Sequence, residues 1–403
     1  MATPQTKAAD TYSPLYFLAS LGAGGVTVSF FMFLMFWVPH AGRPVPIFED
    51  IMAAFNTGDL PMRTAIVIAM AGIAYFAFTN LRLLAWNLSA FSAFKKTEGY
   101  QNLITSNAES TILAMPLAMA MTVNGLFIVG LVFVPGLWGV VEYLFPLALI
   151  AFALIGVQAF MLIGRFLGRV LSKGGVFDVT AHNSFAQLLP AFAVSMVAVG
   201  FSAPAAMSTN PATVGVSLVL STFLGVIAII YTMLAAASAI SSMLQHGTAR
   251  EASPTLMIII PIVTVLGIMF LRQNHGLHTT LEVHGSDGET MIFLTRLLAI
   301  QLGFLGLGAV VLKAQGYFAD FVVGSKTSPG SYALICPAVA LSVMIHFFVN
   351  KGLVASGLIA KFDVAYWSIS GLAILSQIVA IVLIIRLGRQ HFGHQTAVAI
   401  PAE

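Results

Sequence analysis

The sequence predicts an all-α polytopic membrane protein with ten transmembrane helices. Of its 403 residues 59% are hydrophobic and only 8% are charged, a balance far from that of soluble domains. Runs of about 20 apolar residues, long enough to cross a hydrocarbon core of about 30 Å, recur along the chain. Because these runs are uninterrupted and contain Gly and Pro, they indicate helices, whereas a membrane barrel would show short alternating strands.

The ten predicted spans fill almost the whole chain, so one membrane domain over 1–403 is expected. A segment 1–13, an external loop 39–62 and a tail 388–403 lie outside them. The first span has no small-residue cleavage pattern and is predicted to be a retained helix. The predicted spans are 15–38, 64–87, 110–134, 139–163, 183–205, 212–238, 254–271, 290–313, 331–350 and 365–387.

Basic residues are distributed unevenly between the two sides of the membrane. The side that carries both termini holds eleven Lys and Arg residues, and the other side holds five, namely Arg43, Arg63, Arg272, Lys351 and Lys361. By the positive-inside rule both termini are predicted to be cytoplasmic. Arg82 and Arg296 are left inside predicted spans.

The odd-numbered spans share a repeat in which a hydroxyl residue lies six positions before a proline. Helix one joins the repeat if Ser13-Pro14 is matched to Ser328-Pro329, which puts Gly22 in the proline column. The four full copies are Ser110 to Pro116, Ser184 to Pro190, Thr255 to Pro261 and Ser331 to Pro337.

A proline inside a helix removes one backbone hydrogen bond and bends the helix. The freed carbonyl is best accommodated against neighbouring helices or a watery cavity. Five helical hairpins, with their bent odd helices around a central pore, are therefore predicted. The predicted pore-lining residues are Gly22, Met115, Pro116, Leu189, Pro190, Ile260, Pro261, Cys336 and Pro337.

Five such hairpins resemble the tellurite-resistance/C4-dicarboxylate transporter family, which includes the plant slow anion channels. Ser331-Tyr332 followed by Pro337 resembles the start of the family's ninth helix, and Ala355-Ser356-Gly357-Leu358 resembles the stretch before its last helix. The resemblance implies a homotrimer in which each subunit has its own pore for small anions. It also implies a phenylalanine gate just before the helix-nine proline.

Cys336, the one cysteine of the chain, stands where that gate phenylalanine is expected. Either Phe17 or Phe185 is then a candidate to fill the pore at this level. The chain also looks like the TsoY group of bacterial (seleno)proteins, in which a reactive sulfur or selenium here would make sense. Cys336 is thus a small packing residue, or a pore-lining or redox residue. A single cysteine excludes an intrachain disulfide, a four-Cys metal site and a CxxC pair.

Three further residues are candidates for attracting or relaying charge. His346 lies inside a span, where a histidine is a functional candidate by default. It cannot pair with Cys336, because ten residues separate them by about 15 Å along the helix and about 80° around it. Arg82 and Arg296 either supply a positive field or reach the membrane interface.

Two segments outside the spans have open roles. The loop 39–62 carries Ile47, Phe48, Ile51, Met52 and Phe55 on one helical face, so it lies on the membrane or caps the pore. His275, His278 and His284 follow helix seven without a recognised metal spacing, and a solvated polar loop is favoured there.

The favoured function is a channel or uniporter for small inorganic or organic anions in a bacterial inner membrane. No nucleotide-binding motif indicates active pumping, and no enzyme activity, cofactor, metal or nucleic-acid partner is expected. One alternative is a membrane redox protein that uses Cys336 with a bound haem, quinone or other partner. Another is a non-transporting sensor or partner subunit.

Overall fold

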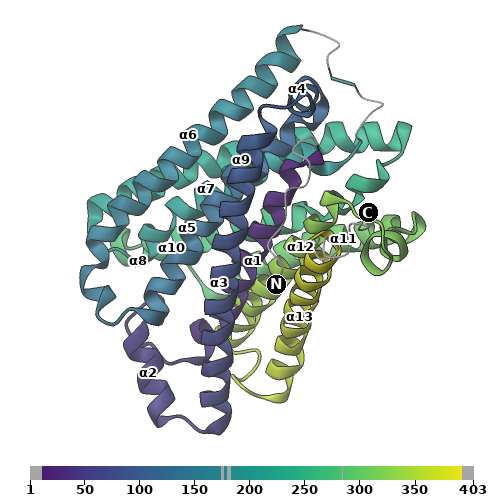
Figure 1. Ribbon diagram of the computed structural model, residues 1–403. Coiled ribbons are helices and arrows are strands. Elements are labelled where there is room, and N and C mark those ends of the chain that lie inside the picture. The colour runs from purple at the N-terminus through teal and green to yellow at the C-terminus, as the bar shows by residue number, and fades with distance from the viewer. Residues whose placement is uncertain (1–10, 174–176, 179–182, 284, 393–403) are drawn as a thin grey trace, which may run out of the picture.

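The computed structural model describes residues 11–173, 177–178, 183–283 and 285–392, and these residues fold into an all-α bundle (Figure 1). Ten of its helices are long and apolar enough to cross a membrane, which confirms the predicted architecture. The even-numbered spans are longer than predicted: the second runs over Leu60–Phe94 instead of 64–87. Their ends extend beyond the apolar stretch that a hydropathy window detects.

The odd-numbered spans form an inner layer and the even-numbered spans an outer one. Within the most apolar window, 56% to 94% of residues are buried in the odd spans, against 17% to 39% in the even spans. The inner helices pack side by side in the closed order α1, α5, α7, α10, α12 and back to α1. They are α1 (Phe17–Trp37), α5 (Ala114–Phe133), α7 (Leu189–Phe201), α10 (Ile259–Leu281) and α12 (Ile335–Phe347).

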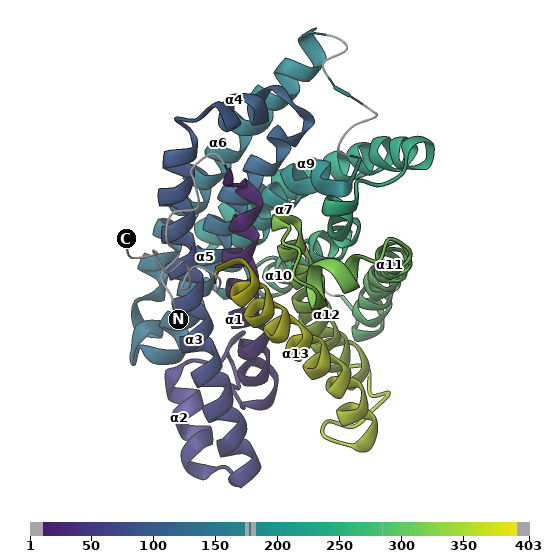
Figure 2. The same ribbon diagram turned by 45° about the vertical axis from the view of Figure 1, so that its right-hand side comes forward.

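Each inner helix is followed in the chain by its outer partner, with which it forms a hairpin (Figure 2). Many leucine, isoleucine, valine and phenylalanine side chains on the outer helices are exposed. A surface of this kind matches lipid tails, which offer no polar partner. The outer helices are α3 (Leu60–Phe94), α6 (Val141–Lys173), α9 (Pro211–His246), α11 (Asp287–Ala314) and α13 (Val364–Phe392).

The repeated proline marks a change of helix type. Pro116, Pro190, Pro261 and Pro337 all lie among the first three residues of their α-helices, directly after a 3₁₀ segment. Proline is tolerated there because an N–H in the first helical turn has little to bond to. The expected bend therefore takes the form of a junction between a tight 3₁₀ turn and the α-helix.

Serine residues start four of the five 3₁₀ segments in the same way. The Ser13 hydroxyl accepts from the Leu15 N–H at 3.3 Å and the Ser328 hydroxyl from the Gly330 N–H at 3.2 Å. Ser106 and Ser184 cap their segments equivalently. The match of Ser13-Pro14 to Ser328-Pro329 is therefore confirmed as a shared cap.

These 3₁₀ segments also pack in a closed order, which we call the 3₁₀ ring. It closes the inner layer at the end from which all five inner helices start. The end of α13 lies on the same side, because the Tyr16 hydroxyl on the ring is 3.2 Å from Nδ1 of His391 on α13. The ring consists of η2 (Pro14–Tyr16), η3 (Asn107–Leu113), η5 (Phe185–Leu188), η6 (Arg250–Met257) and η8 (Pro329–Leu334).

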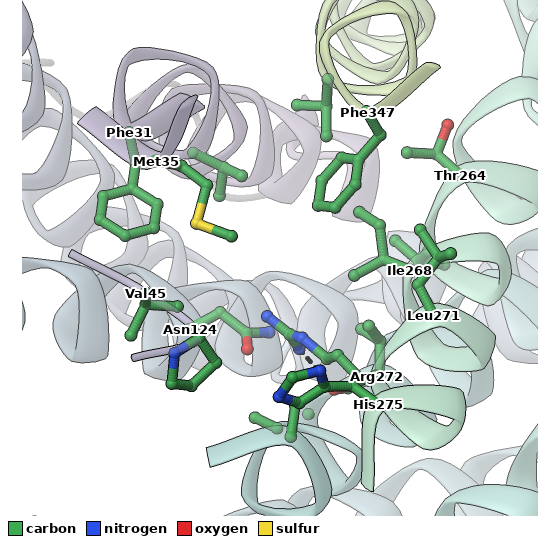
Figure 3. Close-up of a pocket in the computed structure, with 18 of the residues that line it drawn as sticks. Phe31, Met35, Val45, Asn124, Thr264, Ile268, Leu271, Arg272, His275 and Phe347 are labelled. Atoms are coloured by element: carbon green, nitrogen blue, oxygen red, sulfur yellow. Dashed lines mark hydrogen bonds between the residues drawn. The ribbon is translucent and has the colours of Figure 1, made fainter. Parts of the chain in front are cut away.

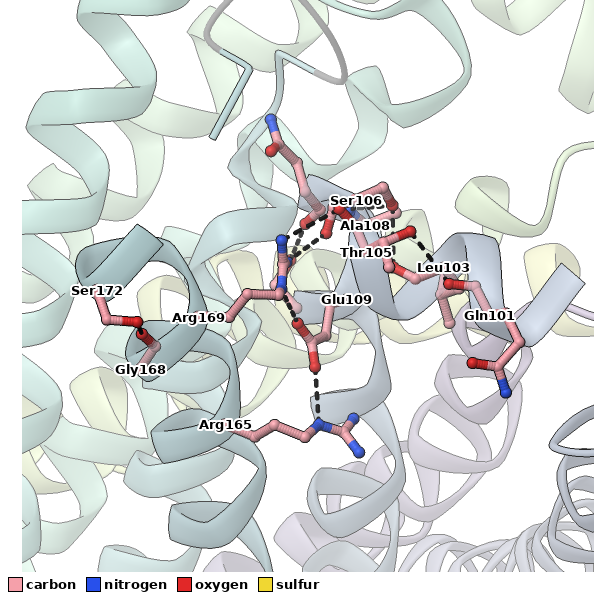
Figure 4. A network of polar contacts seen from close by, with 12 residues as sticks. Gln101, Leu103, Thr105, Ser106, Ala108, Glu109, Arg165, Gly168, Arg169 and Ser172 are labelled. Atoms are coloured by element: carbon pink, nitrogen blue, oxygen red, sulfur yellow. Dashed lines mark hydrogen bonds and ion pairs between the residues drawn. The ribbon is translucent and has the colours of Figure 1, made fainter. Parts of the chain in front are cut away.

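A buried carboxylate holds the ring to the outer layer near the short helix α4 (Glu98–Thr105). Glu109 on η3 is 2% exposed and accepts from Nε of Arg165 at 2.8 Å and from Nε of Arg169 at 3.0 Å. Arg169 also donates to the carbonyl oxygens of Thr105 and Ser106 (Figure 4). Arg165 and Arg169 thus form a structural ion-pair network with Glu109.

At the opposite end of the bundle, the predicted loop 39–62 contains α2 (Phe48–Thr57). Ile47 and Ile51 are buried, and the helix packs against α3 and α5. The Glu49 carboxylate accepts from the Gly136 N–H at 2.7 Å. The segment therefore packs on the bundle at this end, against one helix of each layer.

Candidate functional site

A cavity of about 790 Å³ lies between the five inner helices. Each of them contributes one face, with lining positions three or four residues apart as in a single helical stripe. On α12 that stripe consists of Cys336, Val339, Ala340, Val343 and Phe347. The inner layer thus surrounds a central space, although that space is closed at one end.

The cavity is deep at the end near the 3₁₀ ring and opens at the other end. Gly22, Pro261 and Cys336 line its deep end, close to the start of their helices. At the far end it reaches exposed residues, among them His275 on α10 and Lys351 in the segment after α12. His275 and His278, expected in a polar loop, thus lie on a helix, because α10 continues past its apolar run to Leu281. We call this end the mouth; it faces away from the end of α13.

Of the nine predicted pore-lining residues, three line the cavity, namely Gly22, Pro261 and Cys336. The repeat correctly identifies the depth, but it does not give the rotation of each helix. On α5 and α7 the deepest lining positions are Met121 and Phe192. The residues that lie outside the lining, packed between helices, are Met115, Pro116, Leu189, Pro190, Ile260 and Pro337.

The two candidate gate phenylalanines point toward the outer layer. The ring of Phe17 packs edge-on against Phe91 of α3, with centroids 6.0 Å apart. The ring of Phe185 lies 6.1 Å from that of Phe304 on α11. Neither ring lines the cavity, so neither replaces the family's gate at the level of Cys336.

Arg82 and Arg296 lie on the exposed surfaces of outer helices and do not line the cavity. Of the two roles that the sequence left open for them, this placement argues against a positive field within the cavity. Hydropathy correctly places both arginines within helices. It does not show which face of the helix each side chain occupies.

His346 is fully buried but faces away from the cavity. Its ring is surrounded by Phe33, Phe36 and Trp37 of α1, with centroids 5.7, 6.5 and 6.3 Å away. Neither ring nitrogen has a hydrogen-bond partner in the structure. As predicted from helical geometry, His346 and Cys336 lie on different faces of α12.

The functional residue that the sequence prediction missed is Arg272. It was assigned to the loop after the seventh span, but it lies within α10 and lines the cavity. One of its guanidinium nitrogens, Nη1, donates to the carbonyl oxygen of Val199 on α7 at 2.8 Å. The sequence does contain a signal for Arg272. Helical spacing from Pro261 through Ile268 reaches Arg272, just past the end of the apolar run.

The mouth is lined by cations and by the carboxylates Asp287 and Glu289, and two of the cations are in no ion pair among the described residues. Arg272 forms no ion pair with any described carboxylate, and neither does Lys351. Arg43, by contrast, is paired with Asp50. Figure 3 shows Arg272, His275 and Asn124 directed into the same part of the cavity. A guanidinium with donors beyond its single carbonyl contact is suited to hold an anion here.

His40 also lines the cavity at its mouth. Its Nδ1 lies 2.8 Å from the carbonyl oxygen of Val38. Burial is the largest influence on its pKa and lowers it from the ordinary value, and the nearby Lys351 and Lys361 lower it further.

Metal or redox chemistry finds little support in the arrangement of side chains. Among the described residues, no three His, Cys, Asp or Glu side chains come together as a metal site. His284, one of the predicted loop histidines, lies outside the described residues. Cys336 is 8% exposed at the deep end of the cavity, and its stripe on α12 contains no base.

The comparisons with known proteins give no family assignment. No protein-family model matches the chain, and no curated protein matches it significantly.

Proposed function

We propose that this protein is a channel or uniporter for small anions, which enter the central cavity at its mouth and bind near Arg272. The observation that carries the proposal is an arginine inside a membrane-spanning helix that lines a cavity and has no carboxylate partner. Such a charge is costly in a bilayer unless water or a ligand stabilises it. An anion is the ligand that the guanidinium fits.

The closed end of the cavity determines what permeation requires. Between the deep end and the opposite face of the membrane lies the 3₁₀ ring, with buried side chains such as Leu113, Leu188 and Leu334. The state described by the structure is thus open on one side, and transport requires the ring to separate. Together with the excess of basic residues near the termini, this arrangement favours an outward-facing mouth and cytoplasmic termini.

The resemblance to the tellurite-resistance/C4-dicarboxylate transporter family supports the same proposal. The inner and outer layers have the arrangement that this resemblance implies. On the basis of the same resemblance, we propose that the protein is a homotrimer with one pore in each subunit. We also propose that it lies in a bacterial inner membrane.

Anion flux into proteoliposomes tests the proposal. The native chain is expected to pass nitrate, chloride or a small carboxylate. Cys336→Phe, which puts a bulky ring at the deep end of the cavity, is expected to reduce that flux, whereas Cys336→Ala is expected to leave it nearly unchanged. If the native chain passes none of these anions and Cys336→Phe changes nothing, the proposal is wrong.

The same variants separate the redox alternative from transport. That alternative rests on the position of Cys336 in a solvent-connected cavity. A thiol that reacts with a substrate or a bound quinone requires sulfur at this position. Loss of function in Cys336→Ala, with no loss of protein stability, would therefore favour redox chemistry over permeation.

A further inference from the structure

The charges that line the cavity are all at its mouth. Its described ionisable residues are His40, Arg43, Arg272, His275, His278, Lys351 and the carboxylates Asp287 and Glu289. On α10, eleven residues separate Pro261 at the deep end from Arg272, which corresponds to about 16 Å at 1.5 Å per residue. A chamber of that length lies beyond the last charged group.

The wall of this deep chamber is almost entirely apolar. Its side chains include Leu21, Val28, Met121, Phe192, Val265 and Val339. Thr264 is the polar exception, but its hydroxyl donates to the Ile260 carbonyl at 3.0 Å and accepts from Nε2 of Gln301 at 2.6 Å. Its hydrogen-bonding capacity is thus already used within the protein.

A small hydrated ion has nothing to gain from such a chamber. Moving an ion beyond Arg272 removes its water and supplies no charged partner in return. An apolar group, by contrast, is stabilised there because it leaves water, and pockets that bind organic ligands combine an apolar wall with a few polar groups in this way.

We propose that the cavity selects amphiphilic organic monoanions. A single carboxylate or sulfonate binds Arg272, and the apolar body of the ligand lies in the deep chamber between α10 and α12. This inference rests on the proposed function, in that the cavity must take up an anion at Arg272. It adds that the apolar body, and not the charge alone, determines which anion is bound.

Three carboxylates provide a matched set of probes. Acetate has the charge without an apolar body, benzoate adds one ring, and terephthalate adds to that ring a second carboxylate at its far end. The second carboxylate of terephthalate would have to lie in the apolar chamber or keep the ring out of it. The proposal therefore predicts that benzoate binds most tightly of the three.

Cys336 provides a site-specific readout of binding. It is the one cysteine of the chain and lines the deep chamber, so protection from a small thiol reagent reports occupancy of that chamber. In purified full-length protein, benzoate is expected to slow the reaction at concentrations at least about tenfold below those needed for acetate. Equilibrium dialysis with radiolabelled benzoate measures the same binding without the thiol.

Two variants at one lining position test the role of the chamber. Ile268 lies one turn from Arg272 on α10 and points into the cavity (Figure 3). Ile268→Trp is expected to weaken benzoate binding at least tenfold and to leave acetate binding within about twofold. Ile268→Ala should keep benzoate binding, and thermal melting shows whether each variant is folded.

Equal affinities for acetate and benzoate, or terephthalate binding as tight as that of benzoate, would overturn this inference. Nitrate or acetate flux in proteoliposomes could persist in that case, so the proposed function would stand. If neither flux nor binding of any of these anions is found, both the proposed function and this inference are wrong.

Discussion

Gly22 on α1 faces Ile335 on α12 so closely that a β-carbon added to the glycine would lie 2.7 Å from Cγ2 of the isoleucine. Ordinary carbon–carbon contacts need about 3.5–4.0 Å. The absence of a side chain at position 22 thus lets the first and last helices of the inner layer approach and close it. This is a physical reason for a glycine in the column that holds proline in the other four inner helices.

Gly22→Ala is therefore expected to destabilise the protein, because the added methyl group forces α1 and α12 apart. Overpacking of this kind costs about 1–3 kcal/mol. Thermal melting of the purified protein in detergent should show a lower midpoint. In an Ile335→Ala background the same substitution should cost less, since its contact is gone.

Gly164 supplies the control for this prediction. It is exposed on α6, and a β-carbon there meets no atom within 4 Å. Gly164→Ala should leave the melting midpoint unchanged or raise it slightly, since alanine favours the helix. If both glycine variants lose the same stability, the close approach of α1 to α12 is not the cause.

The Glu109 network should contribute strongly to stability. Removing one partner of a buried ion pair leaves an uncompensated charge, which costs about 3–5 kcal/mol in full burial. Because Arg165 is 45% exposed and can regain water, we expect more than about 2 kcal/mol for Glu109→Gln. This loss of stability should appear as a lower thermal melting midpoint without a change in helix content.

Asp320 offers the matched acidic control. It accepts from Arg250 at 2.7 Å and from Lys326 at 2.8 Å, and these two cations lower the pKa of its carboxyl group. The three side chains are well exposed to solvent, where ion pairs contribute little. Asp320→Asn should barely change the melting midpoint, and a loss as large as that of Glu109→Gln would contradict this explanation.

His40 should make the protein sensitive to mild acid. Because burial lowers its pKa in the folded protein, the unfolded chain binds the proton more readily. Stability therefore rises with pH up to about 6.5, the ordinary pKa of histidine, and falls as the pH drops below that value. Melting midpoints between about pH 5 and pH 7.5 should fall less steeply in His40→Gln than in the native protein.

A histidine outside the mouth serves as the comparison for the pH measurement. His246 is exposed at the end of α9. His246→Gln should keep the pH profile of the native protein. If it flattens the profile as much as His40→Gln does, the acid sensitivity does not come from His40.

Much of the fold could be predicted from the sequence because hydrophobic length and repeat spacing follow directly from the bilayer. The ten spans and the match of Ser13-Pro14 to Ser328-Pro329 are of this kind. The second span was predicted to end at residue 87, although its helix continues to Phe94 and contains two asparagines, Asn80 and Asn87. Both are buried within α3: Asn80 bonds Ser20 and Thr122, and Asn87 bonds Tyr12.

The site was harder to predict because its residues are selected by rotation about each helix axis. The proline repeat placed Cys336 and Pro261 at the right depth, whereas Met115 and Leu189, which match Cys336 in their own copies of the repeat, face neighbouring helices. Arg272 was missed because hydropathy falls where α10 leaves its apolar run, although the helix continues to Leu281. Only the packing of α7 against α10 shows that its guanidinium lies in the cavity.

Arg272 is the residue on which the account depends, and Arg296 is its natural control. Both are arginines within helices that are long and apolar enough to span a membrane, but Arg296 is exposed on α11 and does not line the cavity. Losing a charged hydrogen-bond partner of a bound anion costs about 1.5–3 kcal/mol, which is roughly a tenfold to hundredfold change in affinity.

The most direct measurement is initial anion uptake into proteoliposomes that contain equal amounts of native protein, Arg272→Gln or Arg296→Gln. We predict that Arg272→Gln reduces uptake at low anion concentration at least tenfold, while Arg296→Gln transports like the native protein. Undiminished uptake by a folded Arg272→Gln variant would contradict the central claim that this arginine binds the transported anion.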